Sequence, residues 1–147
     1  MIAVLLAALT CHYHAGGALP DPACTPGALN PAVTQTNIAQ TICRKGWTAT
    51  IRPPVTFTEA LKRRQLVEYG QKGKSLSLWE EDHLLPLELG GSPGDPLNLW
   101  PEPHAGRYGA YRKDGVENHV RALVCNGSWT LVKAQNVFLT DWRKGQL

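Results

Sequence analysis

The chain has 147 residues and a formal net charge of +3 at neutral pH. Apolar residues make up 43% of it and charged residues 18%, a balance that excludes a disordered chain or a collagen-like repeat. This length suits one domain with a modest hydrophobic core and is too short for two full ones.

The amino-terminal segment has the pattern of an export leader. An apolar run, Met1 to Leu9, precedes Gly16-Gly17-Ala18, which resembles a signal-peptidase site. The run is too short to span a bilayer as a helix. We therefore expect a leader at 1–18, a single domain at 19–147, and a secreted or envelope-associated product without stable membrane insertion. An uncleaved strand or helix is the alternative, and Cys11 offers a less favoured lipoprotein interpretation.

The rest of the chain predicts a mixture of helices and short strands. We expect a proline-rich extended arm over 19–31, a short helix over 34–43, and a strand over 47–55 that two prolines end. A helix capped by Thr56 or Thr58 should reach Tyr69, and a strand should cover 76–85. Helices over 107–124 and 130–142 follow, the latter with an apolar face of Leu131, Ala134, Phe138 and Trp142.

The cysteines support an exported protein. Cleavage near Ala18 would leave Cys24, Cys43 and Cys125, and an exported protein tends to pair two of them. The sequence leaves all three pairings open, so we expect one disulfide and one thiol. A zinc site is disfavoured because no CxxC or HxxxH spacing occurs.

The charges are unevenly distributed along the chain. Residues 79–102 hold six acids and no Lys or Arg, whereas residues 21–78 hold eight Lys or Arg against three acids. Residues 103–147 hold seven Lys or Arg against three acids. An acidic segment between basic arms suits a cation site that acts on a polyanion, although an unevenly charged solvated surface explains the counts equally well.

The acidic segment carries residues suited to metal-assisted phosphodiester cleavage. Asp82 and His83 end the strand expected over 76–85, Gly90-Gly91 form a turn, and Asn98 begins the return. A histidine beside a carboxylate can act as a general base while the carboxylate holds a divalent cation. Strand, turn, strand and helix together predict an α+β protein with a compact ββα core at about 76–124.

These residues resemble the HNH-type nucleases, whose fold is also called the ββα-metal or His-Me finger. The resemblance rests on Asp82 to Pro86, Gly90-Gly91, Asn98-Leu99 and the helix that carries Lys113-Asp114. A group of exported bacterial proteins with EDHLxPLELGG and NLWPEP motifs is similar over most of the chain. The family implies a small ββα-metal unit with flanking helices and, here, a loop-rich amino-terminal arm.

The resemblance implies roles for individual residues. His83 matches the general base that deprotonates the attacking water, and its near-neutral intrinsic pKa suits that role. Asp82 matches a ligand for Mg²⁺ or Mn²⁺, and Asn98 matches the asparagine that holds the hairpin and the base in place. The expected activity is divalent-metal-dependent hydrolysis of phosphodiester bonds in nucleic acid, with DNA favoured over RNA.

One expected metal ligand is missing from its usual place. HNH enzymes supply a second ligand from the first turns of the helix, usually His or Asn, but this chain has Arg107 to Arg112 there. Asp114 is the substitute that we predict, with His104, Glu117 and Asn118 as alternatives. Two other functions therefore stay open: an HNH-fold module that binds nucleic acid or the cell surface without catalysis, and a small exported structural protein.

Overall fold

The computed structural model describes residues 9–146, and the apolar run of the expected leader lies mostly outside these residues. The protein is α+β, as the sequence predicts, with four helices and one two-stranded antiparallel sheet in the part described. The elements in chain order are α1 (Trp47–Ile51), α2 (Val55–Glu68), β1 (Trp79–His83), β2 (Leu99–Pro103), α3 (Ala110–Cys125) and α4 (Leu131–Asp141).

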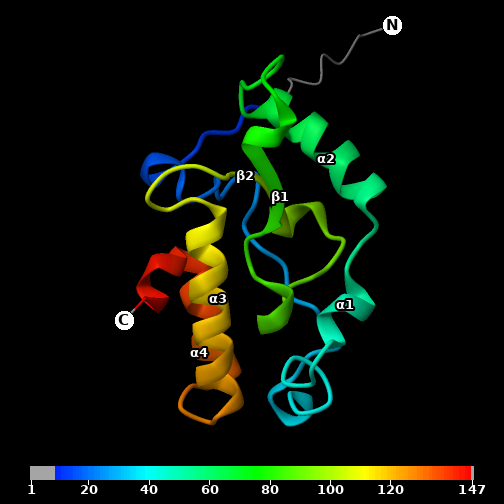
Figure 1. Ribbon diagram of the computed structural model, residues 1–147, viewed down its shortest axis with the longest axis vertical. Coiled ribbons are helices and arrows are strands. Elements are labelled where there is room, and N and C mark those ends of the chain that lie inside the picture. Colours follow the sequence, from blue (N-terminus) through cyan, green and yellow to red (C-terminus); the bar gives the residue numbers. More distant parts are fainter. Residues whose placement is uncertain (1–8, 147) are drawn as a thin grey trace, which may run out of the picture.

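The β1–β2 hairpin lies between helices. Its register pairs Trp79 with Pro103 at one end and His83 with Leu99 at the other. Figure 1 shows α2 on one side of the hairpin and α3 on the other, with α4 beside α3. Because β1 ends at His83, the hairpin presents the Asp82-His83 pair toward the first turns of α3.

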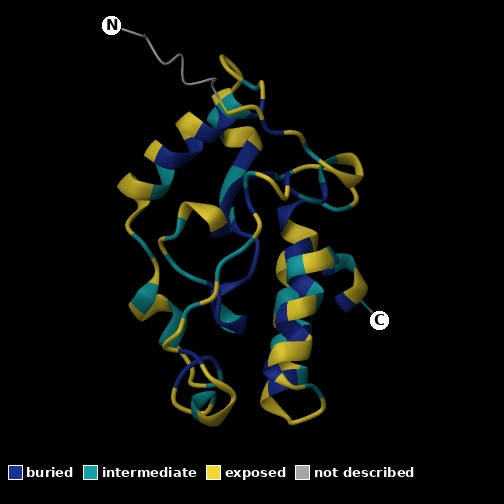
Figure 2. Ribbon diagram, turned by 180° about the vertical axis from the view of Figure 1, so that it is seen from behind, coloured by how far each residue is buried: buried dark blue, intermediate teal, exposed yellow. Residues whose placement is uncertain are grey.

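The hydrophobic core forms between α3, α4 and the loops of the hairpin. The predicted apolar face of α4 is confirmed, since its four residues are at most 3% exposed. They pack in one cluster with Val116 and Val120 of α3 and with Leu85 and Leu89 of the loop between the strands. Figure 2 shows buried and exposed residues alternating along the pair of helices α3 and α4, as expected for helices with one face in the core.

Two disulfides stabilise the chain, so the expectation of one disulfide and one thiol is wrong. Cys43 pairs with Cys125 and ties the loop before α1 to the end of α3. Cys11 pairs with Cys24 and ties the amino-terminal segment to the proline-rich arm. Ala18, beside the expected cleavage site, is 1% exposed and its carbonyl accepts a hydrogen bond from Trp142 Nε1. Residues 9–18 are thus part of the packed structure, and cleavage near Ala18 remains a prediction.

Two predicted elements before the hairpin are wrong. The segment 47–55 is not a strand, because residues 47–51 form the short helix α1. The alternation in that sequence suits a strand only where a neighbouring strand accepts its hydrogen bonds, and none lies there in residues 9–146. The predicted helix over 34–43 shortens to a 3₁₀ turn at Gln35–Asn37, closed by a capping box between Thr34 and Asn37.

The remaining boundaries differ by a few residues. The strand expected over 76–85 is limited to β1, because Leu76–Leu78 form a 3₁₀ turn before it. Helices α2, α3 and α4 lie where the sequence predicts them, with ends shifted by at most three residues. Within residues 9–146, no helix is both long enough and apolar enough to cross a membrane.

Candidate metal centre

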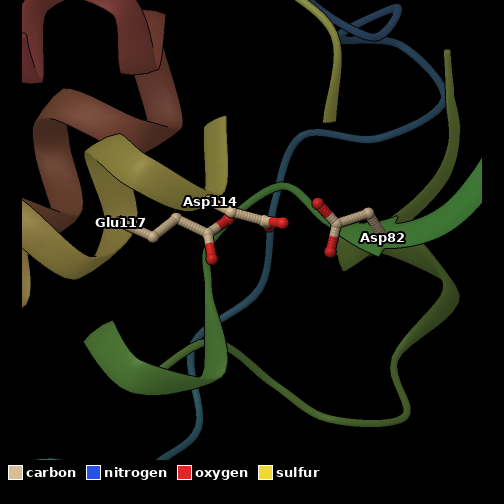
Figure 3. A group of neighbouring side chains, drawn as sticks. All are labelled: Asp82, Asp114 and Glu117. Atoms are coloured by element: carbon tan, nitrogen blue, oxygen red, sulfur yellow. The ribbon is translucent and has the colours of Figure 1, made fainter. Parts of the chain in front are cut away.

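Three carboxylates converge between the end of β1 and the beginning of α3. Oxygens of Asp82, Asp114 and Glu117 all lie within 4.8 Å of one another. Figure 3 shows Asp82 extending from the strand toward Asp114 and Glu117, which extend from α3. The spacing of three residues between Asp114 and Glu117 places both on one face of the helix. Carboxylate oxygens at this separation could hold a metal ion.

The carboxylates line an open polar cavity of about 340 Å³. Its wall also includes His83, Glu80, Glu88 and Asn118. The predicted ligand Asp114 is exposed, and it forms no hydrogen bond or ion pair with any group in residues 9–146. Its oxygens are therefore free to coordinate a cation.

Lys113 is the buried centre of this acidic cluster. Its side chain is fully buried, and its Nζ donates to Asp82 Oδ2 at 2.6 Å, Glu117 Oε1 at 2.8 Å and the His83 carbonyl at 2.8 Å. Two of these bonds, to Asp82 and to the His83 carbonyl, hold the end of β1 against α3, and the third stays within α3. Nζ also lies 3.4 Å from Oε2 of the fully buried Glu102. Burial alone would lower the pKa of Lys113, but Asp82, Glu102 and Glu117 raise it well above its usual value.

The neighbouring carboxyl groups differ in the direction of their pKa shifts. Burial alone would raise the pKa of Asp82, yet the Lys113 ammonium outweighs that effect and holds it below its usual range. Burial raises the pKa of Glu117 and of Glu102, and Lys113 only partly opposes this. The Lys113 ammonium therefore stabilises the ionised form of Asp82.

His83 is held by the loop between the two strands. Its Nε2 lies 2.9 Å from the carbonyl oxygen of Pro93, and because a carbonyl only accepts, Nε2 carries the hydrogen. Burial lowers the pKa of His83, which favours the neutral ring. In that tautomer Nδ1 has a free lone pair, and no group in residues 9–146 donates to it. The geometry leaves His83 ready to accept a proton.

Asn98 holds the same loop through side-chain hydrogen bonds. Its Nδ2 donates to the carbonyls of Leu85 and Ser92, each at 3.0 Å, and its Oδ1 accepts from Leu85 N at 3.0 Å and Ala28 N at 3.4 Å. The side chain is fully buried. Asn98 does not line the cavity beside Asp82, so its contribution is to hold the loop that positions His83.

The glycine pair of the sequence motif serves the same turn. Gly90 has φ +81°, a conformation that favours glycine. At Gly91, a Cβ atom would overlap the Leu85 carbonyl oxygen and lie 2.9 Å from Asn98 Nδ2. The close approach between Gly91 and Leu85 therefore depends on the absence of a side chain.

The structure thus brings together Asp82, His83 and the predicted substitute Asp114. Glu117 joins them although the sequence ranks it only as an alternative, and its position four residues after Lys113 is the signal that favours it. Lys113 lies at the centre of the cluster because the strand packs against the helix, and no local sequence pattern reveals those contacts. His104, another alternative ligand, lies in an adjacent cavity instead.

Comparisons with models of protein families, with curated proteins and with solved structures find no significant match to this chain. The geometry of the centre and its chemistry therefore carry the functional argument.

Proposed function

We propose that the protein is a divalent-metal-dependent endonuclease of the HNH type, which hydrolyses phosphodiester bonds in DNA. The observation that carries the proposal is the meeting of Asp82, Asp114 and Glu117 in a cavity that is also lined by His83, whose Nε2 bonds the Pro93 carbonyl. In this proposal the β1–β2 hairpin and α3 are the ββα unit that the sequence motifs imply.

Each residue of the centre has a separate role in the proposed hydrolysis. His83 accepts a proton at Nδ1 from the attacking water, while its Nε2 hydrogen bond to Pro93 keeps the ring oriented. Asp82, Asp114 and Glu117 would hold Mg²⁺ or Mn²⁺. Such a cation supplies positive charge that offsets the charge developing on the phosphate and the leaving oxygen. Asn98 and Lys113 keep the loop, the strand and the helix in register.

A plasmid-nicking assay tests this function. The purified full chain should convert supercoiled plasmid to open circles with Mg²⁺ or Mn²⁺, and a chelator should stop the reaction. His83→Ala should lower the rate by about 100-fold or more, the usual contribution of a general base. His119→Ala is the matched control, because His119 lies on α3 outside the acidic cavity and should leave the rate unchanged.

A binding module without catalysis is the second candidate. It is favoured by Lys113, whose ammonium already contacts Asp82 and Glu117 and so competes with a metal for their oxygens. If wild-type protein binds DNA but leaves plasmid intact at millimolar Mg²⁺ and Mn²⁺, this second candidate replaces the first. If His83→Ala cleaves as fast as the wild type, the assignment of the base is wrong.

A further inference from the structure

A second cavity extends the acidic one along the protein surface. It has a volume of about 520 Å³ and reaches from β1 to the residues before and within α2. The two cavities share four lining residues, Arg52, Glu80, His83 and Asp114. Because they share these residues, the two cavities adjoin, and we call them together the groove, with the candidate metal centre in the first of them.

Arg52 provides the free positive charge of this groove. It follows the last residue of α1 directly and is exposed, and it makes no hydrogen bond or ion pair within residues 9–146. The other cation on the groove is Lys62, which is buried and already bonded to the Trp79 carbonyl and to Glu59. A phosphate entering the groove therefore has one guanidinium available to it, at the junction of the two cavities.

An exposed aromatic stack lines the second cavity. The rings of His104 and Tyr111 lie with centroids 5.4 Å apart and planes inclined by 24°. The Tyr111 side chain is 74% exposed. His104 stacks on the Tyr111 ring, and the high exposure of Tyr111 leaves ring surface accessible to a planar ligand.

The charge of the second cavity selects which part of a nucleotide enters it. Glu59, Glu80 and Asp114 contribute acidic groups to its wall and would repel a phosphate. A nucleobase carries no charge and has a flat face that stacks on aromatic rings. The groove thus suits a phosphate at Arg52 followed by a base at Tyr111.

We propose that Arg52 and Tyr111 form a subsite for one unpaired nucleotide beside the phosphate that is cut, so that the preferred substrate is single-stranded or locally unpaired DNA. In a duplex the faces of each base are covered by its neighbours, and the base cannot stack on Tyr111. This inference rests on the proposed nuclease function, because it places the subsite relative to the scissile phosphate.

Binding measured by fluorescence anisotropy tests the subsite without requiring cleavage. The probe is a labelled single-stranded DNA oligonucleotide with Mg²⁺ and His83→Ala protein, which keeps the strand intact. Tyr111→Ala in this background should weaken binding by about tenfold, whereas Tyr111→Phe should retain it because the ring remains. Duplex of the same sequence should bind more weakly than the single strand.

Arg52 is tested by the salt dependence of the same binding. Arg52→Ala should reduce the slope of log affinity against log salt by roughly 0.7, the value for one phosphate contact on a single strand. Arg63→Ala is the matched control, because Arg63 is exposed on α2 and lines neither cavity, and it should change the slope less. An abasic oligonucleotide keeps the phosphates but lacks the base that would stack on Tyr111. Tyr111→Ala should therefore not weaken its binding, whereas Arg52→Ala should still reduce the salt slope.

Two results would overturn the subsite. One is equal affinity of the Tyr111→Ala and Tyr111→Phe proteins for the single strand, and the other is duplex binding as tight as single-strand binding. Failure of the proposed function would look different, since wild-type protein would then leave all DNA uncut while its Tyr111-dependent binding persisted.

Discussion

Replacing Asn98 by alanine tests how the loop that holds His83 is fixed. The substitution removes three hydrogen bonds of 3.0 Å, two to the Leu85 peptide groups and one to the Ser92 carbonyl. Leu85 and Asn98 are both fully buried, so water cannot readily replace the lost partners. At about 1–2 kcal/mol for each buried polar group left unpaired, we expect a loss of about 4 kcal/mol in the free energy of unfolding.

The measurement is urea unfolding followed by tryptophan fluorescence, with the disulfides intact. Asn136→Ala is the control, because that asparagine is exposed on α4 and should change stability by less than about 0.5 kcal/mol. Asn98→Asp should be at least as destabilising as Asn98→Ala at neutral pH, since a carboxylate oxygen would face two carbonyls. A loss below about 1 kcal/mol for Asn98→Ala would refute the reasoning, because it would mean that the loop does not depend on these bonds.

Three other substitutions address the turn, the buried carboxyl group of β1 and the central lysine. Gly91→Ala should destabilise the protein by more than about 2 kcal/mol because its Cβ would overlap the Leu85 carbonyl. Gly94→Ala, with open space around it, should be nearly neutral in the same unfolding assay. Burial raises the pKa of Glu81 to about 9, so the folded protein holds a proton that the unfolded chain releases near its ordinary pKa, and stability should fall as pH rises from about 5 to 9. Glu81→Gln should flatten that slope and be more stable at pH 7 by on the order of 2 kcal/mol; an unchanged slope would contradict this account of Glu81. Lys113→Met should lower the free energy of unfolding by about 3–5 kcal/mol. It should also make the melting temperature more sensitive to Mg²⁺ than in the wild type, since the cation would replace the lost ammonium. Equal Mg²⁺ sensitivity in both proteins would argue against that competition.

The sequence predicts the parts of this fold that have strong local signals. Helix α4 follows from its apolar spacing and from Thr130, whose hydroxyl accepts from Lys133 N at the helix start. The turn between the strands follows from its glycines and prolines. The segment at α1 was predicted wrongly because five alternating residues fit a strand or a helix, and only the surrounding structure decides between them.

The candidate site is only partly readable from sequence for a related reason. Asp82 and His83 are adjacent in the chain, so their proximity needs no knowledge of the fold. The meeting of Asp82 with Lys113 spans thirty-one positions and depends on how α3 packs against the hairpin. Arg52 is farther still from α3 in sequence, and no local pattern places it beside Asp114. The pairing of Cys11 with Cys24 does not follow from the sequence, because Cys11 lies in the segment that has the pattern of a leader.

The position of a bound metal tests the central claim most directly. Crystals soaked in Mn²⁺ and measured near the manganese absorption edge should show one anomalous peak within about 2.5 Å of oxygens from Asp82 and from Asp114 or Glu117. Asp114→Asn crystals should show a weaker peak or none. A wild-type crystal at saturating Mn²⁺ with no peak between these carboxylates would contradict the metal centre and, with it, the proposed hydrolysis.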